Sequence, residues 1–193
     1  ISWVKELCPW SEYYGDAYDQ LGLLSDNGKV VMAHSVHSTE QEIELLLERK
    51  IFIAHCPQSN TNLASGAAPV RKYLERGISV GLGSDIAGGY SISILRAMAD
   101  AIQTSKLRWR LLDENLAALT LEEAFYLGTL GGGAFFGKVG SFLPGFEFDA
   151  VVIDDSRLLP PHVLKLRERL ERVVYLSDER DIVGKYVAGE KVL

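Results

Sequence analysis

The 193-residue sequence is poor in cysteine, has no long hydrophobic run and has no excess of basic residues. Its two cysteines, Cys8 and Cys56, are too few to staple a domain of this size, so we expect reduced thiols and a cytoplasmic location. No apolar stretch approaches the roughly 18 residues of a membrane-spanning helix, so we expect no membrane partner. The 20 basic and 26 acidic side chains give a net charge of −6, which argues against a nucleic-acid partner.

Short apolar segments alternate with amphipathic segments over roughly the first 110 residues. Three of the apolar segments run directly into polar residues, namely His34, His55 and Asp85. This alternation is typical of a parallel α/β sheet, in which polar residues at the carboxyl ends of the strands carry the chemistry. Both a (β/α)8 barrel and a doubly wound sheet have this property, and periodicity alone does not choose between them.

The same patterning predicts the individual elements. We expect an opening helix on Trp3, Val4 and Leu7, a turn at 25–28, and a capping box in which Ser38 and Gln41 begin a helix. Further helices are expected at 17–24, 69–76, 91–108, from Thr120 (capped with Glu123) and 161–172. Strands are expected at 30–33, 51–54, 78–83, 142–143, 148–153, 173–176 and 182–192.

Four residues are candidates for chemistry at the strand ends. His34 is placed to bind a divalent metal, the alternative being a core histidine bonded to a backbone carbonyl. Asp85 is placed to bind a metal and take a proton from water, the alternative being a helix N-cap. The neighbours His55 and Cys56 invite a nucleophile pair, but adjacent strand residues point to opposite faces, so we expect Cys56 to lie in the core. His37 is expected on the surface.

Several segments together resemble the amidohydrolase superfamily. They are Met32-Ala-His-Ser35, Ala54-His-Cys-Pro-Gln-Ser-Asn60 and Val80-Gly-Leu-Gly-Ser-Asp85. Within the superfamily the chain looks most like the guanine deaminase family, through Ala87-Gly-Gly-Tyr-Ser91, Leu119-Thr-Leu-Glu-Glu-Ala124, Gly140-Ser-Phe-Leu-Pro-Gly145 and Tyr175-Leu-Ser-Asp-Glu-Arg180. The resemblance covers nearly the whole chain.

The resemblance implies an α/β fold: the C-terminal half of a (β/α)8 barrel at 1–137, and part of a small flanking β-sheet domain at 138–193. By motif match His34 is the metal ligand of the sixth strand and Asp85 the ligand and catalytic residue of the eighth. His55 is implied in the purine pocket, and His162, expected in the helix at 161–172, matches no motif. The family's other histidine ligands and its glutamate match nothing here, and we expect them to precede Ile1 in a longer protein.

The resemblance further implies metal-dependent hydrolysis of guanine to xanthine and ammonia, with one Zn²⁺ (or Fe²⁺) ion per complete site. Guanine and water are the expected partners, in a homodimer of the full-length protein, and the chain by itself is expected to be inactive. The alternatives are a deaminase of another aminopurine, a pterin or a triazine, and a non-catalytic binding or assembly module that shares the fold.

Overall fold

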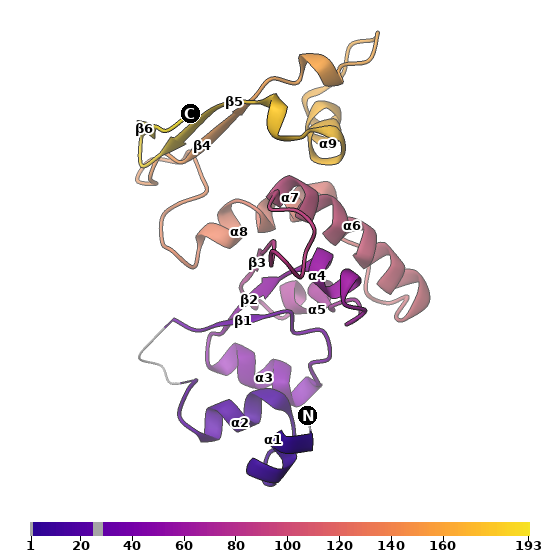
Figure 1. Cartoon of the computed structure of the whole chain (residues 1–193), viewed down its shortest axis with the longest axis vertical. Helices are drawn as coiled ribbons and strands as arrows, with labels where there is room; N and C mark the ends of the chain where they lie inside the picture. The colour runs from indigo at the N-terminus through magenta and orange to yellow at the C-terminus, as the bar shows by residue number, and fades with distance from the viewer. Residues whose placement is uncertain (1, 25–28) are drawn as a thin grey trace.

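The computed structural model describes residues 2–24 and 29–193, so the turn expected at 25–28 lies outside the described residues. Within these ranges the strands form two separate sheets of three strands each. One sheet lies in the N-terminal part of the chain and is parallel, and the other lies near the C-terminus and is antiparallel. Figure 1 shows the first sheet at the middle of the long axis and the second at one end.

The parallel sheet carries the strand ends that the sequence singled out. Its strands are β1 (Val31–Ala33), β2 (Phe52–His55) and β3 (Val80–Leu82), in the order β1-β2-β3. Ile53 at the centre of β2 pairs with Met32 on one side and Val80 on the other. The predicted α/β architecture with parallel strands is therefore confirmed, and the larger half-barrel stays a prediction.

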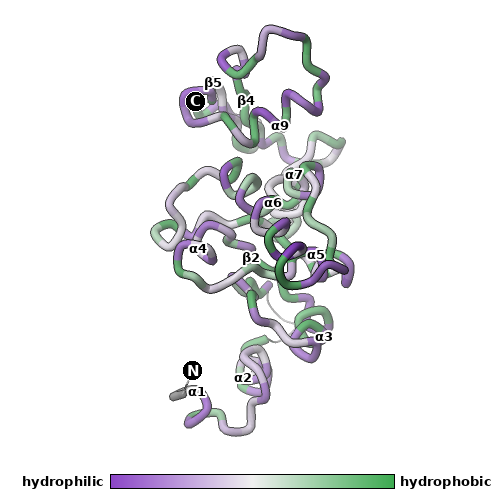
Figure 2. Tube along the Cα trace, turned by 90° about the vertical axis from the view of Figure 1, so that its right-hand side faces the viewer, coloured by the Kyte–Doolittle hydropathy of each residue, from purple (hydrophilic) through white to green (hydrophobic). Residues whose placement is uncertain are grey.

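Helices cover the parallel sheet because each turns an apolar stripe toward it. They are α3 (Glu40–Glu48), α5 (Val70–Glu75), α6 (Ile94–Leu111) and α7 (Leu121–Leu127). Figure 2 shows hydrophobic and hydrophilic residues alternating along α3 and α5, as expected for helices with one buried face. The buried core that joins these helices to the sheet includes Ile43, Leu46, Ile53, Tyr73, Val80, Ala101 and Leu127.

The N-terminal helices α1 (Ser2–Leu7) and α2 (Tyr14–Gln20) lie at the end of the molecule opposite the antiparallel sheet (Figure 1). The expected helix at 17–24 is thus shifted toward the N-terminus. It ends early because Gly22, at a φ of 74°, adopts the left-handed conformation that ends helices, and the N–H of Leu23 then donates to the carbonyl of Tyr18. None of the described helices is long and apolar enough to cross a membrane.

The C-terminal part consists of β4 (Ala150–Ile153), β5 (Ile182–Val187) and β6 (Glu190–Lys191), with α9 (Leu166–Leu176) between β4 and β5. Helix α9 packs on α6 through Val174, which is fully buried beside Met98 and Ile102. The guanidinium of Arg96 on α6 also donates to the carbonyl of Tyr175 at 3.3 Å. The helix between β4 and β5 therefore joins the antiparallel sheet to the helices around the parallel one.

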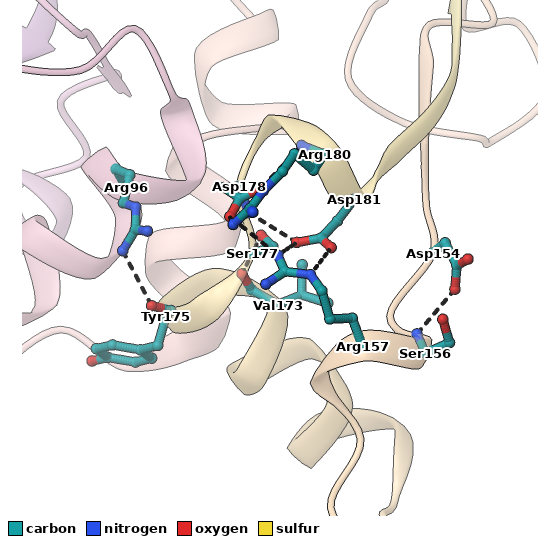
Figure 3. Close-up of polar contacts among 10 residues, drawn as sticks. All are labelled: Arg96, Asp154, Ser156, Arg157, Val173, Tyr175, Ser177, Asp178, Arg180 and Asp181. Carbon is teal, nitrogen blue, oxygen red and sulfur yellow. Dashed lines mark hydrogen bonds and ion pairs between the residues drawn. The ribbon is translucent and has the colours of Figure 1, made fainter.

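An ion-pair cluster closes the loops around α9 (Figure 3). Arg157, in the short 3-10 helix η1 (Ser156–Leu158), donates to both oxygens of the Asp181 carboxylate at 3.0 and 2.7 Å. Asp181 ends a second short helix, η2 (Glu179–Asp181), and also accepts the backbone N–H of Asp178. The hydrogen bonds from Arg157 lower the pKa of Asp181, and those from Arg180 lower the pKa of Asp178.

Two expected strands are wrong, each for a local reason. Residues 142–143 form no strand and lead into a turn at 144–145, since the N–H of Leu143 donates to the Ser141 hydroxyl and its carbonyl accepts the N–H of Phe146. Residues 173–176 belong to α9, because Val173 and Val174 continue a helical stripe into the core rather than an alternating one. The expected helix start at 161 is also wrong: the Glu168 carboxylate accepts the N–H of Lys165, so α9 begins at Leu166 and His162 lies before it.

Three further details of the helices differ from expectation. Thr39, rather than Ser38, caps α3, because its hydroxyl accepts the N–H of Glu42 at 3.2 Å. Two α-helices are not among those expected, namely α4 (Pro57–Asn62) after His55 and α8 (Leu130–Gly133) after α7. The capping box of Thr120 and Glu123 on α7 is confirmed.

The Arg157–Asp181 cluster predicts a loss of stability in acid. A carboxylate whose folded pKa lies below its ordinary value of 3.8 stabilises the fold above that value, and this contribution disappears as the pH falls further. We expect the melting temperature of the protein to fall between about pH 5 and pH 3, and the Asp181→Asn variant to show a flatter fall from a lower starting value. If thermal melts show that the melting temperatures of the wild type and of Asp181→Asn fall equally steeply with decreasing pH, this prediction is wrong.

Candidate active site

The side chains of His34 and Asp85 meet at one edge of the parallel sheet. His34 directly follows β1 and Asp85 follows β3 after two residues, so the ends of the two outer strands bring them together. The His34 Nε2 atom lies 3.8 Å from the Asp85 Oδ2 atom, and the side chains are 40% and 39% exposed. Both residues have a positive φ, of 70° and 45°, a backbone conformation that is uncommon for non-glycine residues.

The competing interpretations of these two residues do not fit the structure. His34 is half-buried, and its Nδ1 atom contacts the side-chain oxygen of Asn60 at 2.8 Å instead of a backbone carbonyl. Asp85 caps no helix, since the N-cap of α6 is Ser93, whose hydroxyl accepts the N–H of Arg96. The geometry therefore leaves both side chains directed at one accessible point.

Helix α4 holds both halves of this candidate site in place. Its residue Asn60 contacts His34, and its residue Asn62 donates to the carbonyl of Gly88 at 2.8 Å in the loop after Asp85. Gln58 of the same helix accepts the N–H of Ser91 at 3.1 Å. The sequence alone assigned no role to these three residues. Pro57, directly after a strand end, is the signal that could have found the helix, because proline is favoured at the first helical position.

Four buried polar atoms in this segment have no hydrogen-bond partner among the described residues: His55 Nδ1, Gln58 Nε2, Ser59 Oγ and Asn60 Nδ2. Nearly all buried polar atoms in folded proteins are paired, so four unpaired atoms within six residues are unusual. They lie at the end of β2 and in α4, beside the His34–Asp85 pair. The fifth such atom among the described residues is Arg108 Nε, so most of these unpaired buried side-chain atoms lie at the candidate site.

His55 and Cys56 are both buried and both kept uncharged. The imidazole of His55 is 2% exposed, and burial, with a smaller effect of His34, lowers its pKa to about 4. Burial, with a smaller effect of the Asp85 charge, raises the pKa of the Cys56 thiol to about 11. The expected core position of Cys56 is confirmed, and a neutral thiol is a poor nucleophile. The place of His55 in a purine pocket stays a prediction.

The remaining histidines lie away from the pair. His37 is exposed, as expected, and its Nε2 atom contacts the carbonyl of Ser65 at 2.8 Å. His162 is exposed in the segment before α9. Over residues 2–24 and 29–193, no three or more side chains of histidine, cysteine, aspartate or glutamate form a group that could hold a metal ion.

The donor atoms of His34 and Asp85 nevertheless fit a divalent cation. An imidazole nitrogen and a carboxylate oxygen are ordinary zinc ligands, with bonds of about 2.0–2.2 Å, so one ion reaches both atoms across a gap of 3.8 Å. Catalytic zinc sites have three protein ligands, and the described residues supply two. The site can therefore contribute part of a metal centre.

Comparison with known proteins shows the family of the chain. The Amidohydrolase family matches residues 10–192, which is nearly the whole chain. The chain belongs to the amidohydrolase family. It is 40% identical over its full length to a guanine deaminase of Dictyostelium discoideum. A crystal structure of guanine deaminase from C. acetobutylicum, with guanine bound in its active site, matches the full chain at 48% identity and a TM-score of 0.94.

A more distant structural relative is an adenosine deaminase from Xanthomonas campestris with bound zinc, at 28% identity and a TM-score of 0.74 over 91% of the chain. It is matched over 39% of its own length. The chain spans 44% of the Dictyostelium protein and 46% of the C. acetobutylicum protein. This amidohydrolase chain therefore corresponds to less than half the length of the guanine deaminases it matches.

The close approach of Gly88 to the site predicts a specific sensitivity. A Cβ atom at Gly88 would lie 2.7 Å from the Ser59 hydroxyl and 2.9 Å from Asp85 Oδ2, so an alanine must displace one of them. We expect Gly88→Ala to lower the unfolding free energy by about 1–3 kcal/mol in denaturant titrations. Gly184→Ala in β5 is the control, because its Cβ would make ordinary contacts at 3.4 Å. Equal losses of unfolding free energy in Gly88→Ala and Gly184→Ala would contradict the inferred crowding at Gly88.

The thiol environments predict selective alkylation. At pH 8 a thiol of pKa about 11 is almost entirely protonated, and Cys56 is also buried. We expect iodoacetamide to modify the half-buried Cys8 in the native protein and to leave Cys56 unmodified until denaturant is added, as measured by peptide mass spectrometry. Equal labelling of both residues under native conditions would show that Cys56 is accessible.

Proposed function

We propose that the full-length protein carrying this chain hydrolyses guanine to xanthine and ammonia. The observation that carries the proposal is the approach of His34 Nε2 to Asp85 Oδ2, 3.8 Å apart at the strand ends. Similarity to guanine deaminases over the whole chain supports guanine as the substrate. The proposal includes the fold implied by the resemblance: half of a (β/α)8 barrel at 1–137, and part of a flanking β-sheet domain at 138–193.

His34 and Asp85 are proposed to hold one divalent cation, Zn²⁺ or Fe²⁺, together with ligands supplied by protein outside these 193 residues. The zinc bound by the X. campestris relative supports a divalent ion. When bound, such an ion supplies Lewis-acid activation of water, whose pKa it lowers toward 7. His34 contributes a neutral imidazole to this centre.

Asp85 is proposed to carry the protons of the reaction. Its carboxylate accepts a proton from the attacking water as the water oxygen bonds to C2 of guanine. It then returns that proton to the amino group, the C2–N bond breaks, and ammonia leaves. The proton still on the water-derived oxygen passes to the carboxylate that protonated the ring nitrogen, and the oxygen remains on C2 as the new carbonyl of xanthine. Protonation of the ring nitrogen is assigned to a glutamate outside this chain. A neutral His55 is proposed to line the purine pocket.

The chain by itself is proposed to bind metal weakly and to turn over no guanine, because two ligands are fewer than a catalytic zinc site needs. The complete protein is further proposed to be a cytoplasmic homodimer with no nucleic-acid or membrane partner. A non-catalytic module would bind no catalytic metal even in the full-length protein, so metal content distinguishes it from the proposed enzyme.

The assignment of the ligands predicts unequal effects of two histidine substitutions. In the full-length protein we expect His34→Ala to remove most of the bound metal and to lower kcat/KM for guanine by about 100-fold or more, since metal activation supplies several kcal/mol. His37→Ala is the control, because the His37 imidazole is exposed and contacts the carbonyl of Ser65, and this variant should retain both the metal and the activity.

Elemental analysis and the absorbance change of guanine conversion measure the two properties. Equal metal loss in His34→Ala and His37→Ala would overturn the ligand assignment. A metal-replete wild-type protein that converts adenosine, a pterin or a triazine but leaves guanine intact would overturn the substrate and favour the other deaminases. A wild-type protein that binds no metal would favour the non-catalytic module.

A further inference from the structure

The contact between Asn60 and His34 has the geometry that fixes the state of a metal-binding imidazole. The Asn60 side-chain oxygen lies 2.8 Å from His34 Nδ1, on the ring edge away from Asp85. Asn60 is 2% exposed, and its backbone is anchored at both ends: its N–H donates to the carbonyl of Cys56, and its carbonyl accepts the N–H of Ser65. The amide is therefore presented to His34 from a fixed position.

This contact determines which ring nitrogen carries the proton. An amide oxygen only accepts hydrogen bonds, so His34 Nδ1 must be the donor and carries the hydrogen. The Nε2 atom then has a free lone pair, and Nε2 is the atom that lies 3.8 Å from Asp85 Oδ2. Metal-binding histidines ordinarily donate their other N–H to an oxygen acceptor, which fixes both the tautomer and the ring orientation.

We propose that Asn60 is a positioning residue, which keeps His34 in the Nδ1–H tautomer and so presents Nε2 to a divalent cation. This inference rests on the proposed function and deepens it. It assigns a role to the last residue of the His-Cys-Pro-Gln-Ser-Asn segment through an atom that touches neither substrate nor metal. It also requires no change in Asp85, which is the other ligand of the proposed site.

Three substitutions separate the acceptor atom from the structure around it. Asn60→Leu keeps the approximate size of the side chain and removes the acceptor oxygen. Asn60→Ala also removes the acceptor oxygen but does not introduce the branched side chain of leucine. Asn60→Asp keeps an oxygen acceptor for His34 Nδ1, replaces the amide nitrogen, which has no partner among the described residues, with a second oxygen, and adds a negative charge. Thr61→Val is the control in the same helix, where it removes the hydrogen bond from the Thr61 hydroxyl to the carbonyl of Pro57.

The first measurement is the ¹⁵N chemical shift of the His34 ring in the metal-free full-length protein, labelled at histidine. We expect the Nδ1–H tautomer in the wild type, Asn60→Asp and Thr61→Val, and a mixture of tautomers in Asn60→Leu and Asn60→Ala. A wild-type protein in the Nε2–H tautomer would overturn the proposal without any variant. An unchanged tautomer in both acceptor-free variants would do the same.

The second measurement is zinc affinity by competition with a chelator. Loss of the acceptor should weaken binding by about 10- to 100-fold in Asn60→Leu and Asn60→Ala, with wild-type affinity retained in Thr61→Val and restored in Asn60→Asp. Equal weakening in Asn60→Asp or Thr61→Val would show a structural effect and overturn the proposal. A protein that has the expected tautomers and zinc affinities but leaves guanine intact would overturn only the proposed function.

Discussion

Parallel pairing on both sides of β2 is the constraint on which the candidate site depends. The hydrogen-bond ladder continues past the strands, since the N–H of His34 donates to the carbonyl of Ala54 and the N–H of Gly83 donates to the carbonyl of His55, both at 2.9 Å. The backbone leading to each candidate ligand is thereby pinned to the end of the same central strand. A one-residue slip in either register would turn the corresponding side chain away from the pair.

Side chains of helix α4 contact both of the segments that follow the outer strands. It starts immediately after β2, so its position is set by the strand that the other two share. From there Asn60 reaches the end of β1, while Gln58 and Asn62 reach the loop that follows β3. One short helix thus links both outer strands, and this explains why the amide side chains of Gln58 and Asn60 are buried although amides normally lie at the surface.

The sequence predicted the parts of this arrangement that depend on local patterns. Apolar runs ending in His34 and Asp85 predicted two strand ends, and the parallel fold brings strand ends to one edge, so their proximity followed from topology. The role of Asn60 was not predictable in this way, because it depends on a contact across 26 residues. Val173 and Val174 were misassigned because β-branched residues favour strands, whereas here burial against α6 outweighs that preference.

The edges of the parallel sheet relate the partial site to the proposed complete one. Within the described residues, β1 and β3 each pair with a strand on one side only, which leaves one backbone edge of each strand without a strand partner. Parallel strands occur almost entirely in sheets covered on both faces and extended by further strands. Strands added in parallel at these edges would deliver their own carboxyl ends to the rim where His34 and Asp85 already lie. In the proposed complete site, the further ligands and the glutamate would enter on strands paired at these two edges, so the pairing that places His34 and Asp85 would also place them.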